Sequence, residues 1–125
     1  MNGDWEEEDD ELPTRVNTVD VKSVLRELRP HLLKMAEGPG APAEFKLDDA
    51  QVVIGRGSDA DIRIKSQDLS RKHVKLVRRG TEYRVDDLDS RNGMLLNGVK
   101  VLSATLRDQD VLQLGSVVLI YQEGT

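Results

Sequence analysis

The chain has 125 residues, a length that fits one compact domain with an appendage. It contains no cysteine, which excludes disulfides, thiolate metal sites and a cysteine nucleophile. Residues 1–12 contain seven acidic residues and no basic one, and the rest of the chain is nearly neutral, with 16 acidic and 18 basic residues. We therefore expect no broad cationic surface that would bind nucleic acid. No apolar run is long enough to cross a membrane, and the acidic N-terminus does not resemble a signal peptide. We therefore expect a cytoplasmic protein without nucleic-acid or membrane partners.

The first 37 residues are predicted to form two segments. Residues 1–19 are an acidic tail that we expect to be disordered, because like charges at this density oppose collapse. In residues 20–37 apolar side chains recur at spacings of three and four, which predicts a short amphipathic helix with a kink or break at Pro30. Its apolar face consists of Val21, Val24, Leu25, Leu28, Leu32 and Met35. This face would pack on the same domain or dock a partner.

A compact β-domain is predicted to follow. Residues 38–43 contain two glycines and two prolines, which break regular structure and predict a linker before a domain at residues 44–125. Within that domain short runs of Val, Ile and Leu alternate with turn residues, a pattern typical of strands. The runs lie at residues 44–47, 51–54, 62–64, 74–79, 83–87, 94–96, 99–102, 111–114 and 117–122. Residues 79–81 and Asn97-Gly98 read as hairpin turns, so we expect an all-β sandwich or barrel.

Two loops carry residues suited to binding an anion. Residues 55–57 are Gly-Arg-Gly directly after a predicted strand, which presents Arg56 on a loop, although a solvated turn arginine is the commoner explanation of that tripeptide. Residues 70–73 are Ser-Arg-Lys-His, and their hydroxyl, amides and cations could together hold a phosphate. A catalytic pairing of Ser70 with His73 is disfavoured, because three residues in a loop do not set up a nucleophile and base. We expect His73 to brace the loop instead.

A third loop carries an asparagine suited to a peptide. Residues 89–93 are Asp-Ser-Arg-Asn-Gly, an ordinary turn composition in which Asn92 can nevertheless hydrogen-bond an extended backbone through both its N–H and its C=O groups. No paired carboxylates, metal-ligand cluster or nucleophile arrangement has credible spacing. We therefore expect no catalytic residue, metal or cofactor, and a binding protein rather than an enzyme.

The three loops together resemble a known family. In order and spacing, Gly55-Arg56, Ser70-Arg71-Lys72-His73, Ser90-Arg91-Asn92-Gly93 and Asn97-Gly98 resemble the forkhead-associated (FHA) domain. The resemblance extends over about residues 44–122. It implies an eleven-stranded β-sandwich whose loops bind phosphothreonine in an extended peptide.

The resemblance also implies a role for each motif residue. Arg56 and Ser70 would contact the phosphate, Arg71 and Arg91 would flank it, and Asn92 would hold the peptide backbone. Structural roles are implied for Gly55, His73, Gly93, Asn97 and Gly98. Two positions depart from the family pattern. Met94 replaces the usual threonine, and Gln109 replaces a frequent glycine, which suggests that the turn at Asp108–Asp110 avoids positive φ.

The expected function is that of a phosphothreonine-peptide-binding adaptor in Ser/Thr kinase signalling. Its partner would be a threonine-phosphorylated protein, such as a Ser/Thr kinase or its substrate. The alternative is a structural or assembly FHA module that binds proteins independently of phosphate. Thr18, and after it Thr14, are candidate phosphorylation sites whose phosphorylated tail would bind the domain intramolecularly, although a role of Thr18 in starting the helix is the commoner explanation.

Overall fold

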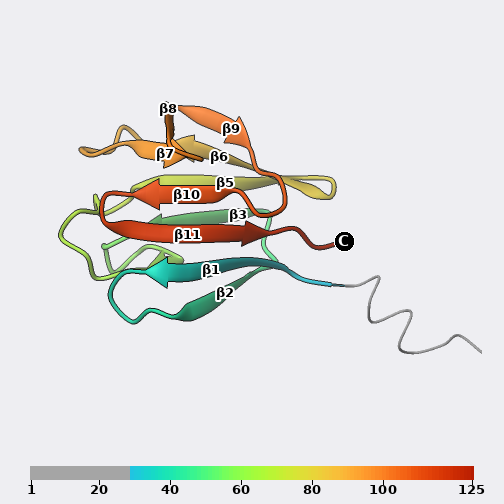
Figure 1. Ribbon diagram of the computed structural model, residues 1–125, viewed down its shortest axis with the longest axis horizontal. Coiled ribbons are helices and arrows are strands. Elements are labelled where there is room, and N and C mark those ends of the chain that lie inside the picture. Colours follow the sequence, from blue (N-terminus) through green and yellow to red (C-terminus); the bar gives the residue numbers. More distant parts are fainter. Residues whose placement is uncertain (1–28) are drawn as a thin grey trace, which may run out of the picture.

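A computed structural model describes residues 29–125, which form eleven strands in two sheets (Figure 1). The strands are β1 (His31–Glu37), β2 (Ala43–Leu47), β3 (Gln51–Gly55), β4 (Ile62–Arg63), β5 (Val74–Arg79), β6 (Glu82–Asp87), β7 (Met94–Leu96), β8 (Val99–Val101), β9 (Ser103–Thr105), β10 (Val111–Leu114) and β11 (Val117–Gln122). One sheet has the order β2-β1-β11-β10-β7-β8, and the other has the order β4-β3-β5-β6-β9. All strand pairs are antiparallel except β3 with β4. The predicted eleven-stranded all-β sandwich is confirmed within the described residues.

The core lies between the two sheets because the strands alternate apolar and polar residues. In β11, Val117, Leu119 and Tyr121 are fully buried, while the residues between them are only half-buried. Leu76 of β5 and Val85 of β6 pair directly across the second sheet and are also fully buried. Burying each such side chain contributes about 1.5–3 kcal/mol to folding. This packing gives the loops at the sandwich ends a rigid base.

The helix predicted for residues 20–37 is wrong over residues 31–37, which form strand β1. This strand lies between β2 and β11 and hydrogen-bonds with both, so pairing on two sides outweighs its helical spacing. Leu33 and Met35 point into the core with a period of two, whereas Leu32 of the predicted helical face is only half-buried. Arg29 and Pro30 have no regular structure, and residues 20–28 of the predicted helix, the acidic tail, Thr14 and Thr18 lie outside the described residues.

The predicted domain boundary at residues 38–43 is also wrong. Those residues form the turn between β1 and β2, and Ala43 already belongs to β2. Gly38 and Gly40 have φ of +138° and +89°, values that glycine adopts without a Cβ penalty. The composition shift therefore marks a tight connection inside the sandwich, and the domain includes β1.

The turn at Asp108–Asp110 has positive φ, contrary to expectation. Gln109 has φ of +70°, and its N–H donates to the carbonyl of Tyr121 at 2.7 Å. The Asp110 carboxylate accepts the N–H of Arg107 at 2.8 Å. These bonds outweigh the roughly 1–2 kcal/mol that a left-handed conformation costs a residue with a side chain. Met94, the other departure from the family pattern, is buried in the core.

A buried histidine ties the start of β1 to the C-terminal segment. His31 is 2% exposed, and its Nδ1 accepts the N–H of Gly124 at 3.1 Å and the hydroxyl of Tyr121 at 2.7 Å. Burial, aided by the nearby charge of Arg78, lowers the pKa of His31 from its ordinary value of 6.5. The folded protein therefore holds this imidazole neutral.

The neutral histidine predicts a loss of stability in mild acid. Below a pH of about 6.5 His31 becomes protonated in the unfolded chain before it does so in the folded protein. The free energy of unfolding therefore falls by at most about 1.4 kcal/mol per pH unit. Above that pH the contribution is fully present. Thermal unfolding of wild type and His31→Gln between about pH 7.5 and 5.5 measures it. The variant is expected to lose less stability over this range, and an equal loss would contradict the assignment.

Candidate functional site

Three loops meet at one end of the sandwich: the loop after β3, the loop between β4 and β5, and the loop between β6 and β7. The N–H of Arg56 donates to the carbonyl of Ser70 at 3.1 Å, and that of Gly57 donates to the carbonyl of Arg71 at 3.0 Å. The hydroxyl of Ser70 accepts the N–H of Arg91 at 3.0 Å. Ser70 is therefore the junction of all three loops.

Two glycines let the first two loops pack this closely. A Cβ on Gly55 would overlap the carbonyl of Arg71 and lie 2.9 Å from the carbonyl oxygen of Ser70. A Cβ on Gly57 would lie 3.0 Å from the carbonyl oxygen of Arg71. Arg56 stands between these glycines and is exposed. Its backbone is thus held in the packed loops while its guanidinium reaches solvent.

A buried histidine connects the second loop to the third. The Nδ1 atom of His73 accepts the N–H of Ser70 at 3.0 Å, and its Nε2 lies 2.7 Å from the carbonyl oxygen of Gly93. Because Nδ1 is an acceptor, the proton is on Nε2 and is donated to Gly93. The side chain is fully buried, so both bonds are shielded from water. His73 thereby fixes the separation of two loops, which is the contact expected of a bracing residue.

The third loop is held by its own polar side chains. The hydroxyl of Ser90 donates to the carboxylate of Asp87 and accepts the N–H of Gly93 at 2.9 Å. Asn92 donates from Nδ2 to the carbonyl of Asp68 at 2.7 Å, which ties this loop to the second one. Asn92 is exposed, and its Oδ1 and second N–H can still pair with an extended peptide backbone.

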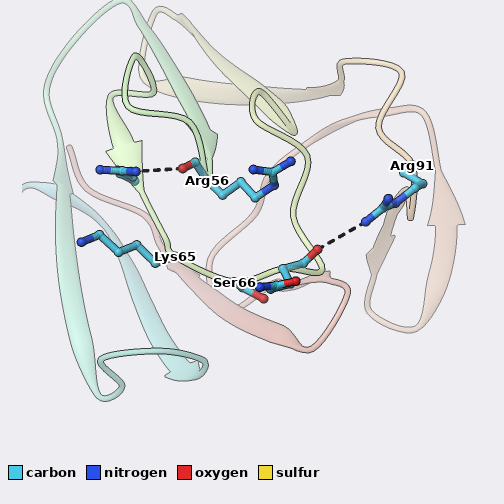
Figure 2. Close-up of a pocket in the computed structure, with 6 residues that line it drawn as sticks. Arg56, Lys65, Ser66 and Arg91 are labelled. Atoms are coloured by element: carbon cyan, nitrogen blue, oxygen red, sulfur yellow. Dashed lines mark hydrogen bonds between the residues drawn. The ribbon is translucent and has the colours of Figure 1, made fainter.

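An open hollow of about 470 Å³ lies among these loops. It is lined by Arg56, Arg63, Lys65, Ser66, Gln67 and Arg91, that is, by four cations and two neutral polar side chains (Figure 2). Of the residues predicted to flank a phosphate, Arg91 lines this hollow and Arg71 does not. The hollow therefore brings together two of the three predicted arginines.

Sequence reasoning missed Arg63 and Lys65. They alternate with the buried Ile62 and Ile64, so both side chains face the exposed side of the segment. Arg63 lies opposite Gly55 in the parallel β3–β4 pair, next to Arg56. The Ile-Arg-Ile-Lys alternation close behind the first arginine is the signal that could have identified them.

The Asn97-Gly98 turn lies away from the hollow and fastens another hairpin. The two residues have φ of +51° and +84° and connect β7 to β8, so the predicted hairpin turn is confirmed. Asn97 donates from Nδ2 to the carboxylate of Asp110 at 2.9 Å and accepts the N–H of Val111 at 2.8 Å. Its side chain thereby joins the hairpin to β10.

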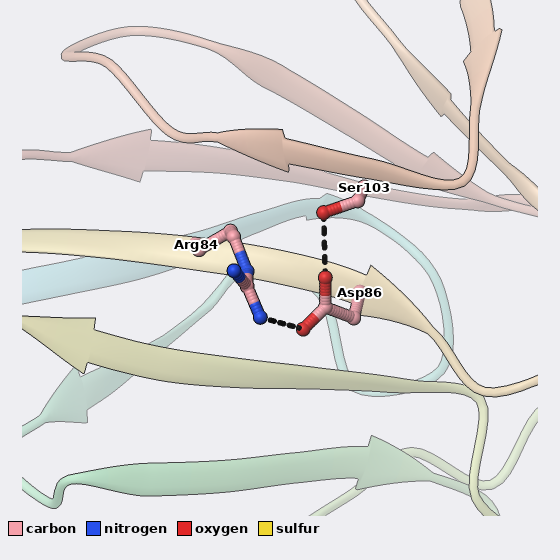
Figure 3. Close-up of polar contacts among 3 residues, drawn as sticks. All are labelled: Arg84, Asp86 and Ser103. Atoms are coloured by element: carbon pink, nitrogen blue, oxygen red, sulfur yellow. Dashed lines mark hydrogen bonds and ion pairs between the residues drawn. The ribbon is translucent and has the colours of Figure 1, made fainter.

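Unlike the cationic hollow, a polar cluster on β6 and β9 contains both a cation and a carboxylate, which neutralise each other (Figure 3). Arg84 pairs with the carboxylate of Asp86 at 3.1 Å, and the hydroxyl of Ser103 donates to the same carboxylate at 2.6 Å. The Ser103 hydrogen bond, helped by Arg84, lowers the pKa of Asp86 below its ordinary value. Asp86 therefore stays charged and fastens the short edge strand β9, whereas the hollow contains cations without a carboxylate.

The fold and the loops define a β-sandwich module that presents a cationic hollow at one end. The chain belongs to the FHA domain family, because the family's sequence profile matches residues 52–115. This finding confirms the predicted family. The described residues contain no helix long and apolar enough to cross a membrane.

The relatives of this chain include two bacterial regulators. It is 36% identical over 93 residues to the glycogen accumulation regulator GarA of Mycolicibacterium smegmatis, a match that covers 74% of this chain and 59% of that protein. It is 34% identical over 94 residues to the oxoglutarate dehydrogenase inhibitor of Corynebacterium jeikeium, with 75% and 65% covered. The chain thus spans less than two thirds of either relative.

The solved structures support the same fold. One domain, solved in a structural and functional analysis of phosphothreonine-dependent FHA domain interactions, superimposes with a TM-score of 0.72 at 29% identity. The match covers 77% of this chain and 98% of that one. The sandwich described above is therefore an FHA-type sandwich.

Proposed function

We propose that this protein binds peptides containing phosphothreonine and acts as a cytoplasmic adaptor in Ser/Thr kinase signalling. The observation that carries the proposal is the junction of the three loops, where Ser70 hydrogen-bonds the backbones of Arg56 and Arg91 at 3.1 and 3.0 Å. Both arginines also line the cationic hollow. A phosphate group with three acceptor oxygens suits such a convergence of donors.

Each motif residue has a task in this proposal. Arg56 pairs with the phosphate through its planar fork of N–H groups, a geometry that matches phosphate oxygens. The Ser70 hydroxyl already accepts an N–H from Arg91, so its own hydrogen can be donated to the phosphate. Arg91 flanks the phosphate, Arg71 does so from outside the hollow, and Asn92 holds the peptide backbone.

The relatives support a role exerted by binding rather than by catalysis. They are named as a regulator and an inhibitor, and the domain solved in the phosphothreonine study has the same fold. We infer that the partner is a threonine-phosphorylated protein, such as a Ser/Thr kinase or its substrate. No catalytic role is proposed for any residue.

The chain's own N-terminal segment is a second ligand that the proposal includes. Thr18 lies 38 residues before Arg56 in the sequence, so once phosphorylated it would compete with partners at a high effective concentration. Phosphorylation of the intact chain is expected to weaken binding of an added phosphothreonine peptide. Thr18→Ala should restore that binding, with Thr14→Ala as the matched control. Equal weakening in Thr18→Ala would contradict the role of Thr18.

The proposal is tested by isothermal titration with matched peptides. Phosphothreonine peptides are expected to bind with micromolar affinity, and their unphosphorylated forms are not expected to bind. Phosphoserine forms lack one methyl group, which is worth about 0.8 kcal/mol, so they should bind roughly fourfold more weakly. Binding that is equal with and without phosphate would favour a phosphate-independent assembly module instead.

A further inference from the structure

The hollow contains more positive charge than one phosphate group can neutralise. A phosphothreonine carries about −1.5 to −2 charges at pH 7. The hollow is lined by four cations and by no carboxylate. Two cations suffice for the phosphate, so about two positive charges are left for another anion. The hollow has a volume of about 470 Å³, which is in the range of sites that hold whole small molecules. It therefore has room for a second anionic group beside the phosphate.

The four cations are spread along the hollow. In Figure 2 the Arg56 guanidinium lies between Arg91 on one side and Lys65 on the other. The guanidinium of Arg63 is held by a hydrogen bond from its Nε to the carbonyl of Arg56 at 3.1 Å. At the other end Arg91 donates to the carbonyl of Gln67 at 3.4 Å. Arg63 is thus positioned by the backbone, and its remaining N–H groups can bind a ligand.

These cations are not neutralised by the rest of the described domain. Between residues 29 and 125, the two ion pairs are Lys72 with Asp59 and Arg84 with Asp86. Neither pair includes Arg63 or Lys65. The same part of the chain has 15 bases against 14 acids, so the excess in the hollow is local rather than a property of the whole surface. A local excess of this kind attracts anionic groups to the hollow.

We infer that Arg63 and Lys65 form a second subsite, which binds an aspartate or glutamate side chain of the same peptide that places its phosphothreonine at Arg56 and Ser70. This inference rests on the proposed function and narrows it to phosphothreonine peptides with an acidic residue nearby. An extended peptide advances about 3.3 Å per residue, so a carboxylate two to four residues from the phosphothreonine can reach across the hollow. Arg63 binds the carboxylate through its fork of N–H groups, and Lys65 adds a second charge.

The test compares peptides that all contain one phosphothreonine and differ only in the residues around it. Three phosphothreonine peptides are titrated into the full chain: one with neutral flanks, one with aspartates two to four residues before the phosphothreonine, and one with aspartates two to four residues after it. One of the acidic peptides is expected to bind roughly three- to tenfold more tightly than the neutral peptide, an effect in the range of partly exposed charge pairs. The more strongly bound peptide identifies the direction in which the ligand runs.

Two double variants test whether the tighter binding of the acidic peptide depends on Arg63 and Lys65. R63Q/K65Q is expected to abolish the acidic peptide's advantage while leaving the neutral peptide within about twofold of wild type. The control K46Q/R79Q removes the same charge from two exposed residues, with Arg79 at the far end of β5. This control variant should still bind the acidic peptide more tightly than the neutral one.

The outcomes separate the two proposals. If no peptide binds in a phosphate-dependent way, the proposed function fails, and this inference fails with it. If phosphate-dependent binding is present but neither acidic peptide binds more tightly than the neutral one, the subsite alone is wrong. The subsite is also wrong if the advantage survives in R63Q/K65Q or disappears equally in K46Q/R79Q.

Discussion

Replacing Arg56 with alanine is expected to weaken binding of a phosphothreonine peptide by about 100-fold. An arginine fork can form two charge-assisted hydrogen bonds with a phosphate, each worth about 1.5 kcal/mol or more, and about 3 kcal/mol corresponds to this factor. Arg56 lines the cationic hollow, and its N–H is bonded to the loop that carries Ser70. Isothermal titration of the variant with phosphorylated and unphosphorylated peptide measures the change.

The effect on binding should not come from misfolding. The Arg56 side chain is exposed, and its backbone hydrogen bond to Ser70 is kept by alanine. The midpoint of thermal unfolding should therefore change little. Arg79→Ala is the matched control, because it removes an exposed arginine from the opposite end of β5. If R56A binds phosphopeptide within about twofold of wild type, the phosphate does not bind at Arg56.

Most strands could be predicted because their burial follows their sequence pattern. The strands at Val74–Arg79, Met94–Leu96, Val111–Leu114 and Val117–Gln122 have the predicted bounds. Strand β9 was missed because Ser103–Thr105 has no apolar alternation and depends on pairing with β6. Strand β1 was missed because spacings of three and four in a short apolar segment also fit a strand that pairs on both sides.

The loop motifs were predictable as sequence, but their contacts were not. The spacing indicated that Arg56, Ser70 and Asn92 belong to one family pattern, and it could not show that Asn92 uses one N–H on the carbonyl of Asp68. Arg63 and Lys65 were missed because they lie on, and just after, a short strand between motifs. Which cations share a hollow depends on how β4 pairs with β3, and that pairing is parallel, so no tight hairpin turn in the sequence predicts it.

The largest effect on stability is expected for Gly55→Ala. The added Cβ would overlap the carbonyl of Arg71 and lie 2.6 Å from its carbonyl carbon, and these are backbone atoms that cannot rotate away. Either β3 or the loop that carries Ser70 must move, which breaks the hydrogen bonds from Arg56 and Gly57. Overpacking costs about 1–3 kcal/mol and each of the two lost hydrogen bonds about 1 kcal/mol, so the variant should lose about 3–5 kcal/mol of unfolding free energy.

The matched control separates the clash from the general effect of adding a methyl group. Gly80 has open space around its Cβ position and φ of +63°, so Gly80→Ala should cost only the conformational strain of about 1–2 kcal/mol. Chemical denaturation measures both losses, and titration with phosphopeptide measures binding by the folded fraction. Gly55→Ala should lose both stability and affinity, because the displaced loop contributes Ser70 to the junction, whereas Gly80→Ala should keep its affinity. Equal affinities in the two variants would show that the loop contact at Gly55 does not position the binding site.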